Sequence, residues 1–172
     1  MSETNGMEKK HASFAPETTR DTRLLILGSL PGAVSLAAQA YYAHPRNHFW
    51  RIMGMLLDEE NFAARSYAWR LRILKKNRIG LWDVVAQAER EGSLDQNLKN
   101  ITENPLTELI ETLPNLRAIA FNGNTATRIG MRQLKTLGDY APVCLSLPST
   151  SPANTMPFSE KLTMWQAVCL YL

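Results

Sequence analysis

Cysteine is scarce in this sequence, and the two cysteines that occur are too few for a thiolate metal site. Cys144 and Cys169 are the only ones among 172 residues, and no C-x-x-C pair is present. A zinc knuckle and an iron–sulfur cluster held by four thiolates of this chain are therefore excluded. Isolated thiols of this kind are typical of buried, reduced cysteines in a cytosolic protein.

Long apolar runs are missing too. No stretch approaches the ~20 apolar residues of a membrane span, and the polar N-terminus lacks the pattern of a signal peptide. Hydrophobic residues make up 45% of the chain, charged residues 20%, and the net charge is +3. These values are typical of one soluble domain, and the slight positive charge is compatible with a polyanionic partner.

Common phosphate-binding and nucleophile motifs are absent as well. The segment "GSLPG" (28–32) follows an apolar run, but it lacks the lysine of a P-loop and the glycine spacing of a dinucleotide fingerprint. A G-x-S-x-G nucleophile elbow does not occur either. The two glycines would let the backbone approach a ligand closely and form an anion-binding concavity, although a bare turn explains the same residues.

Short, nearly continuous apolar runs alternate with segments of helical spacing. The runs are typical of parallel strands that are covered on both faces, and they occupy residues 23–29, 79–85, 116–123 and 141–149. Helical spacing is found over 47–57, 66–77, 104–113 and 158–172, the last with Ser159 as the expected cap. We predict a three-layer α/β/α domain over 21–172 with a central, mainly parallel four-stranded sheet, preceded by a mobile tail over 1–20.

Ligands of open parallel sheets bind beyond the carboxyl ends of the strands. Four short segments follow the predicted strands and become the candidate site: Gly28 to Gly32, Trp82-Asp83, Phe121 to Gly123, and Leu147 to Ser149.

The segment between the first predicted strand and the first predicted helix is the most distinctive part of the chain. It reads "GSLPG" and then "YYAHPRNHFW" (41–50). This combination resembles the uracil-DNA glycosylase superfamily, whose mismatch-specific branch has a G-x-N-P-G loop followed by aromatic-A-H-P-x-N-x-F-W. "GLWDVV", "FNGNTA" and "LPSTSP" resemble further signatures of that family, so the resemblance spans about residues 23–170.

Two positions depart from the family pattern. Leu30 stands where the mismatch-specific branch has its catalytic asparagine, and Leu147 replaces the His or Asn that opens the last loop in several branches. A leucine cannot orient a water molecule. The pattern G-S-x-P-G with Y-Y-A-H-P-x-N-x-F-W is similar to the hypoxanthine-DNA glycosylase branch, and there the resemblance assigns catalysis to Asn47.

The resemblance implies a pocket that holds a flipped base. Tyr42 is the expected stacking residue, with Tyr41 and Phe49 as alternatives, and Gly28 and Ser29 would border the base. Asp83 would accept a hydrogen bond from N1–H of hypoxanthine or N3–H of uracil and would meet a lone pair on adenine; its alternative is a helix cap.

Other polar residues of the same motifs have two interpretations each. Asn47 would orient the attacking water through its amide oxygen, or act as a helix N-cap. His44 would polarise the sugar or stabilise the departing base, or be a structural histidine before Pro45. Asn122 would donate to a base oxygen, or cap the next helix.

Contacts with the DNA backbone are expected from the last loop. Ser149, Thr150, Ser151 and Asn154 form a hydroxyl-rich segment suited to phosphates, although a plain loop is the alternative. Met156 is a candidate wedge for the vacated base stack. The most basic segment, residues 65–78, is either a solvated helix face or a surface that approaches DNA.

The sequence therefore predicts a monofunctional DNA glycosylase that removes a deaminated base, hypoxanthine in the first instance. We expect a monomer without metal or cofactor, located in the cytoplasm (bacterial cytosol or nucleoid-associated), that acts on double- or single-stranded DNA with a damaged base. The alternatives are a uracil or mismatched-pyrimidine glycosylase and a lesion-binding module without activity, because Leu30 and Leu147 replace polar residues.

Overall fold

The computed structural model describes residues 9–172 and is built around a parallel sheet. The sheet has four strands in the order β3 (Ile79–Asp83), β2 (Leu24–Gly28), β6 (Ala118–Asn122) and β7 (Val143–Leu147), and every neighbouring pair is parallel. All residues of β2, β3 and β6 are buried, as their continuous apolar runs predict. The α/β class and the four-stranded parallel sheet predicted from the sequence are confirmed.

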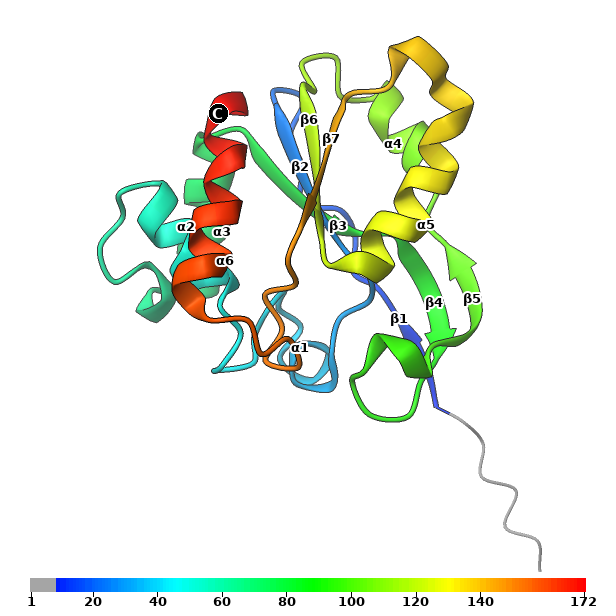
Figure 1. Cartoon of the computed structure of the whole chain (residues 1–172), viewed down its shortest axis with the longest axis horizontal. Coiled ribbons are helices and arrows are strands. Elements are labelled where there is room, and N and C mark those ends of the chain that lie inside the picture. Colours follow the sequence, from blue (N-terminus) through cyan, green and yellow to red (C-terminus); the bar gives the residue numbers. More distant parts are fainter. Residues whose placement is uncertain (1–8) are drawn as a thin grey trace, which may run out of the picture.

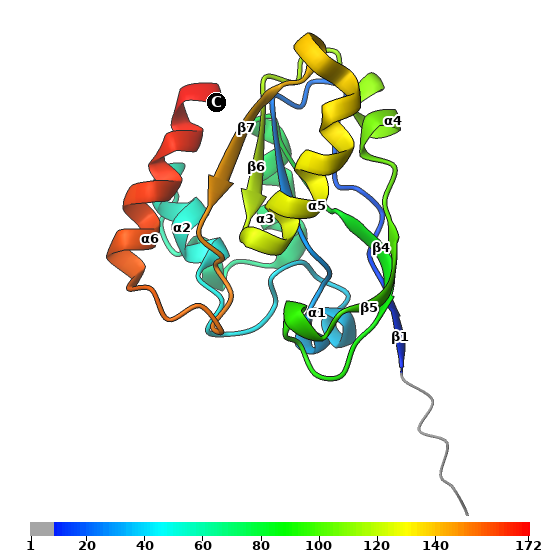
Figure 2. The same ribbon diagram turned by 45° about the vertical axis from the view of Figure 1, so that its right-hand side comes forward.

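Helices cover both faces of this sheet (Figures 1 and 2). Leu24 and Ile26 of β2 belong to a core cluster with the helices on one face, while Leu25 and Leu27 belong to a second cluster on the other. This alternation follows from the period of two along a strand. The first face carries α2 (Phe49–Leu56), α3 (Tyr67–Lys76) and α6 (Phe158–Trp165), and the second carries α4 (Leu106–Glu111) and α5 (Asn124–Leu134).

Shorter helices complete the chain. Helix α1 (Ala33–Ala38) follows β2, and residues 9–172 also form four 3₁₀ segments: η1 (Phe62–Ala64), η2 (Asp95–Asn97), η3 (Lys135–Tyr140) and η4 (Gln166–Tyr171). Helix α6 begins at Phe158 with Pro157 at its N-cap and no side-chain cap, so the predicted capping role of Ser159 is wrong. The proline supplies the extended backbone that starts the helix, and no side-chain acceptor is used.

A second, antiparallel sheet was not expected from the sequence. It has the order β1 (Lys10–Ala12), β4 (Val85–Glu89) and β5 (Lys99–Glu103). Only Val84 separates β3 from β4, so the apolar run predicted as one strand over 79–85 is divided between two sheets. Asp83 is therefore followed by a strand, and the alternative that it caps a helix is wrong.

Residues 10–17 are part of the folded domain, contrary to the tail predicted over 1–20. Strand β1 pairs with β4, and Glu17 exchanges two backbone hydrogen bonds with Leu81 of β3, at 2.9 and 3.0 Å. Short polar segments such as this one acquire order only through tertiary pairing, which a local pattern does not reveal. Residues 1–8 of the predicted tail lie outside the described residues.

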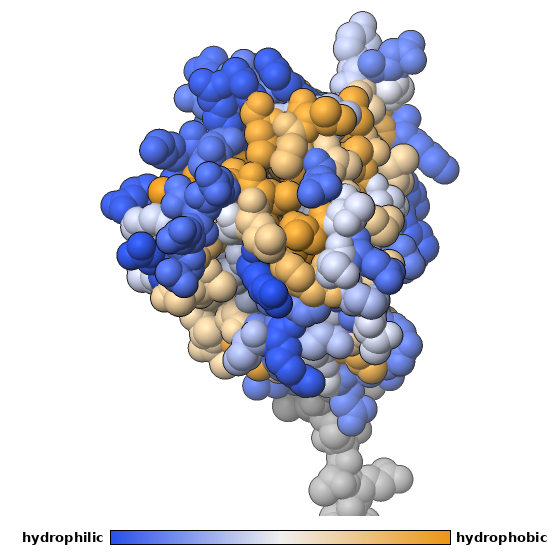
Figure 3. Space-filling model, turned by 60° about the vertical axis from the view of Figure 1, so that its left-hand side comes forward, coloured by the Kyte–Doolittle hydropathy of each residue, from blue (hydrophilic) through white to orange (hydrophobic). Residues whose placement is uncertain are grey.

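On one side of the molecule, charged side chains surround an apolar patch. Figure 3 views the side on which α2, α3 and α6 lie, and apolar side chains gather there among charged ones. Met164 and Leu170 are the exposed apolar residues of the C-terminal helical region. No helix in the described part of the chain is both long enough and apolar enough to cross a membrane. The predicted burial of both thiols is wrong, because Cys169 is exposed and Cys144 is only half-buried.

Candidate active site

One cleft of about 870 Å³ lies at the carboxyl ends of the parallel strands and collects the predicted site residues. Its walls come from the β2–α1 loop, the segment before α2, the ends of β3 and β6, and the loop after β7. The predicted residues that line it are Gly28, Ser29, Tyr42, His44, Asn47, Asp83, Asn122, Ser149, Thr150, Ser151 and Asn154. Residues up to 126 positions apart in the chain thus share one cavity, as the parallel topology requires.

Asp83 lies at the floor of the cleft with its carboxylate directly above Gly28. A Cβ at position 28 would lie 2.7 Å from Asp83 Oδ1 and 3.2 Å from the Tyr42 hydroxyl, so only glycine leaves room for both groups. The other carboxylate oxygen, Oδ2, accepts a hydrogen bond of 2.7 Å from Ser13 Oγ. Burial raises the pKa of Asp83 to about 7, and the Ser13 hydrogen bond opposes that shift.

Tyr42 is held in an unusual conformation against the core. Its φ is +55°, in the left-handed region that bulky residues rarely adopt. One face of its ring stacks on Phe49 with a centroid distance of 4.0 Å. The hydroxyl is buried and finds no hydrogen-bond partner among the described residues. Burial and the nearby Asp83 carboxylate raise the pKa of this phenol, so it stays a protonated donor.

The other two aromatic candidates are occupied. Phe49 is fully buried behind Tyr42. Tyr41 is 2% exposed, and its hydroxyl donates to the carbonyl of Ala15. Of the three aromatic candidates, Tyr42 is therefore the one with ring surface available to a ligand in the cleft. Phe49 and Trp50 are core residues, as helical spacing predicts.

Asn47 and His44 form a tight turn at the mouth of the cleft. Asn47 Oδ1 accepts the backbone N–H of Phe49 at 2.9 Å, which fixes the turn before α2. The N-cap residue of α2 is His48, so the interpretation of Asn47 as the helix N-cap is wrong. A carbonyl oxygen has a second lone pair, which is available to a water molecule in the cleft. His44 Nδ1 accepts the N–H of Arg46 at 3.1 Å. Both side chains stay partly exposed beside the cavity.

Asn122 connects β6 to the last loop. Its Nδ2 donates to Thr150 Oγ1 at 2.9 Å, and its Oδ1 accepts the Thr150 N–H at 2.8 Å. Asn122 therefore does not cap the next helix. Thr150 is fully buried, and its carbonyl accepts the N–H of His48 at 3.0 Å. The predicted contact between Thr150 and phosphate is wrong, because its polar groups are used to fix the loop.

The loop over 148–156 is held from below by a buried lysine. Lys161 of α6 is fully buried, and its Nζ donates to the carbonyls of Asn154 and Ser151 at 2.8 and 3.4 Å. Burial lowers the pKa of this ammonium group. Ser149 Oγ accepts the N–H of Ser151, and Asn154 Nδ2 donates to the Ser149 carbonyl. Ser149, Ser151 and Asn154 remain half-buried at the cleft, in a rigid frame.

The first loop has a buried anchor of its own. Arg90 is 3% exposed and donates to the carbonyls of Leu30 and Pro31. Ser29 Oγ donates to Asp95 Oδ1 at 2.7 Å, and the Arg90 guanidinium lies 3.8 Å from the same oxygen. Burial raises the pKa of Asp95, and the Ser29 hydrogen bond and the Arg90 charge oppose the shift.

Leu30 and Leu147, which replace polar family residues, are packing residues. Each is 5% exposed, and they belong to the two core clusters on opposite faces of the sheet. Neither side chain can contribute a polar atom to the cleft. Any group that orients a water molecule must therefore come from the remaining polar residues that line it.

Three residues that support the cleft were missed by the sequence analysis: Ser13, Arg90 and Lys161. Each donates hydrogen bonds to a side chain far away in the chain or to backbone carbonyls, and no local sequence motif indicates such a contact. Asn104 is a fourth case, because the sequence indicates it only as the first residue of the segment with helical spacing over 104–113. Its amide donates to the backbone carbonyls of Asp83 and Val85, which fixes the turn between the two sheets.

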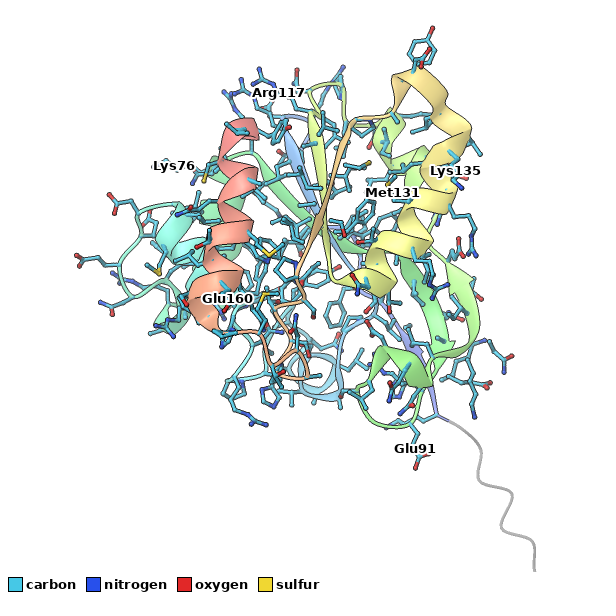
Figure 4. All side chains as sticks on the ribbon, viewed as in Figure 1. Lys76, Glu91, Arg117, Met131, Lys135 and Glu160 are labelled. Carbon is cyan, nitrogen blue, oxygen red and sulfur yellow. The ribbon has the colours of Figure 1, made fainter. Side chains whose placement is uncertain are left out.

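The most basic segment lies away from the cleft. Helix α3 ends at Lys76, just before the amino end of β3, and Lys76 and Arg117 project at the end of the molecule opposite to α1 (Figure 4). Lys75 pairs with Glu17 at 2.6 Å, and Arg70 packs over the Trp50 ring at 4.4 Å. These contacts favour the interpretation of a solvated and partly packed helix face.

The arrangement is suited to a flat, polar heterocycle. Tyr42 offers an aromatic face, Asp83 Oδ1 a hydrogen-bond acceptor, and the Tyr42 hydroxyl a donor with no other partner. A buried acceptor and donor that are left unpaired each cost about 1–3 kcal/mol, so the cleft favours a ligand with complementary groups at its edge.

Known proteins with similar sequences and structures agree with this description. The family model of the Uracil DNA glycosylase superfamily matches residues 15–172. A protein named hypoxanthine DNA glycosylase from Methanosarcina barkeri (strain Fusaro / DSM 804) is 36% identical over 163 residues, which is 91% of this chain and 96% of that protein. One of the same name from Methanosarcina acetivorans is 39% identical over 162 residues, covering 90% and 95% of the two chains.

A solved structure shares the fold. A solution NMR structure from Methanosarcina acetivorans, described as a candidate uracil DNA glycosylase, superimposes with a TM-score of 0.82 at 37% identity. The match covers 94% of this chain and 97% of that one. The resemblance inferred from the loop and A-H-P-x-N-x-F-W motifs is confirmed by these matches.

Proposed function

Because the chain belongs to the uracil DNA glycosylase superfamily, we propose that it is a monofunctional DNA glycosylase that excises hypoxanthine. The names of its two curated relatives support this substrate. The observation that carries the proposal is the cleft in which Tyr42, Asp83 and Asn47 meet. A flipped purine needs a stacking surface, an edge reader and a positioned water, and these three residues supply one each.

Base recognition follows from the two groups above Gly28. The free face of Tyr42 stacks on the flipped base, an interaction worth ~1–3 kcal/mol. Ionised Asp83 accepts from N1–H of hypoxanthine through Oδ1. Adenine has a lone pair at N1, and two facing acceptors repel one another. The Tyr42 hydroxyl is free to donate to an acceptor on the base, which adenine, with its amino group at C6, does not offer at that position.

Hydrolysis requires a water molecule on the sugar side of the base. Asn47 orients that water through its amide oxygen, but an amide does not take up its proton. The water oxygen bonds to C1′, the C1′–N9 electron pair leaves with the base, and the surplus proton of the water passes to solvent while the base is protonated. His44, beside Asn47, stabilises the charge that develops at the sugar or the base.

The remaining contacts hold the DNA backbone. Ser149, Ser151 and Asn154 are placed to contact phosphates of the strand that carries the lesion. Met156 also lines the cleft and is a candidate to fill the vacated position in the base stack. No lysine of the described chain lines the cleft, which supports hydrolysis without a Schiff-base lyase step.

Replacing Asn47 tests the catalytic assignment. Asn47→Ala should reduce single-turnover excision from a deoxyinosine duplex by about 10²–10³-fold, comparable to the loss of other preorganised polar groups in active sites. It also removes a turn hydrogen bond, which costs ~1 kcal/mol of stability. Excision is measured as strand scission after alkali, and binding to the same duplex by gel shift.

Ser66→Ala is the matched control. Ser66 Oγ accepts the N–H of Trp69 at the start of α3, away from the cleft, so its loss has a similar cost in stability. This variant should excise hypoxanthine at the wild-type rate. Full activity of Asn47→Ala would contradict the role given to Asn47.

Uracil is the second candidate substrate. The family name and the description of the solved neighbour favour it, and N3–H of uracil offers Asp83 the same donor as N1–H of hypoxanthine. Excision of uracil in preference to hypoxanthine would agree with the family membership but would contradict hypoxanthine as the main substrate.

A further inference from the structure

Ser13 belongs to a segment that is fixed at both ends. On one side β1 pairs with β4, and the Ser13 N–H donates to the Ala86 carbonyl at 2.8 Å. On the other side Glu17 forms two backbone hydrogen bonds with Leu81. The segment between these anchors crosses the carboxyl end of β3, so Ser13 has a defined position beside Asp83, 70 residues away in the chain.

The contact between the two side chains is short and involves one specific oxygen. Ser13 Oγ donates to Asp83 Oδ2 at 2.7 Å, a distance typical of a strong O–H···O⁻ bond. With Oδ2 used in this way, Oδ1 is the oxygen that lies over Gly28 and faces the cleft. The orientation of the Asp83 carboxylate relative to a ligand therefore depends on a residue outside every motif of the sequence.

The Ser13 hydroxyl has a second acceptor. The carbonyl of Phe14 lies 3.3 Å from Oγ and also accepts from Trp82 Nε1 at 3.0 Å. A hydroxyl has one proton and rotates to suit its surroundings. When Asp83 is ionised the proton points to Oδ2; when Oδ2 is protonated, the hydroxyl can accept from it and donate to Phe14 instead.

Several other groups face Asp83 and act on its charge. Tyr41 and Tyr42 approach from the segment before α2, Tyr67 from the start of α3, Asp95 from η2, and Arg90 from the residue after β4. Asp95 and burial disfavour the ionised carboxylate, whereas Arg90 and Ser13 favour it. Ser13 is the favourable partner in direct hydrogen-bond contact.

We propose that Ser13 is a positioning residue for base recognition, which holds the Asp83 carboxylate ionised with Oδ1 directed at the flipped base. This inference rests on the proposed function, because it assumes that Asp83 reads the base. Without the hydroxyl, Asp83 should bind its proton more tightly, so that at a given pH fewer molecules present an ionised carboxylate to the ligand.

The experiment is the pH profile of single-turnover excision from a deoxyinosine duplex, between pH 5 and 9. In the wild type, excision should rise with pH as Asp83 ionises, with a midpoint near its pKa of about 7. Ser13→Ala should move that midpoint upward by about one pH unit, because a hydrogen bond to a charged group is lost. The rate at high pH should approach that of the wild type.

Ser13→Thr keeps the hydroxyl and should restore the wild-type midpoint. General damage to the domain would lower the rate at every pH and leave the midpoint unchanged, and that result for Ser13→Ala would overturn the inference. Asp83→Asn distinguishes the role of Asp83 in the proposed function from the positioning role of Ser13. It should abolish the rise of the excision rate with pH. If Asp83→Asn keeps the wild-type profile, the assignment of Asp83 in the proposed function fails. If it abolishes the titration while Ser13→Ala does not shift it, only the role of Ser13 fails.

Discussion

Gly28 leaves room for the two polar groups that form the floor of the cleft. Any side chain there would meet Asp83 Oδ1 and the Tyr42 hydroxyl, and the 2.7 Å approach to Oδ1 is closer than real Cβ atoms come. The residue is the last of β2 and is fully buried, so the β-carbon would have no other direction to take. The absence of a β-carbon at position 28 thus determines where Asp83 Oδ1 and the Tyr42 hydroxyl, the proposed readers of the base edge, can lie.

Gly28→Ala should therefore reduce hypoxanthine excision by about 10–10²-fold, because displacements of an ångström or less at a reacting centre have effects of this size. The measurement is the single-turnover rate per folded molecule. Gly54→Ala is the matched control: its Cβ would lie equally close, 2.7 Å, to Phe62 Cβ in the core beside α2. It should lose stability and keep the rate. An equal rate loss in both variants would contradict a local effect at the cleft.

Side chains at the strand ends were predictable, but their exact partners were not. Asp83 and Asn122 follow apolar runs, so the sequence placed them at the cleft. Asn122 was expected to read the base or cap a helix, and it binds Thr150 instead. That pairing joins residues 28 positions apart and depends on how the last loop folds back, which no local pattern encodes.

At the scale of elements, the loop after β7 depends on helix α6. The Lys161 ammonium donates to two loop carbonyls from a fully buried position. Burying a cation with only neutral partners costs folding free energy. The presence of Lys161 therefore indicates that a fixed geometry of this loop is needed. The loop presents Ser149, Ser151 and Asn154 to the cleft, and its shape would decide whether all three can make the phosphate contacts proposed for them.

Lys161→Met should raise KM for a deoxyinosine duplex on the order of tenfold, equivalent to ~1.4 kcal/mol of lost binding, with a smaller change in kcat. Steady-state kinetics at fixed salt measure this. Lys76→Met removes an exposed positive charge at the far end of the molecule and serves as the control. A KM that rises equally in both variants would indicate a general charge effect and would contradict the role of the loop.

The elements themselves were predictable where burial is continuous. Strands β2, β3, β6 and β7 and the four predicted helices follow from their apolar patterns. Helix α1 and strands β1, β4 and β5 were missed, since they are short and partly exposed and their order comes from pairing. Helix α5 (Asn124–Leu134) was expected only as a helix after Asn122, without bounds. Residues 10–17, which include Ser13, also owe their order to strand pairing, and the sequence predicted them as part of a mobile tail.

At the scale of the whole molecule, the candidate active site and the arginines that precede the parallel strands lie at opposite ends. The cleft lies at the carboxyl ends of the parallel strands, whereas the arginines that precede β2, β3 and β6 lie at the amino ends, as Arg23, Arg78 and Arg117. The net charge of +3 is modest. In the proposed function, recognition of a lesion therefore depends on the shape and hydrogen-bonding groups of the cleft, with the loop after β7 as the proposed contact to the DNA backbone.

The most direct test of the central claim compares three end-labelled duplexes that contain one deoxyinosine, one deoxyuridine or no lesion. Each is incubated with excess wild-type protein, and strand scission after alkali reports the abasic sites formed. The account predicts the strongest cleavage at deoxyinosine, weaker or no cleavage at deoxyuridine, and none on the undamaged strand. No cleavage of any duplex, with gel-shift binding intact, would contradict it and identify a lesion-binding module without glycosylase activity.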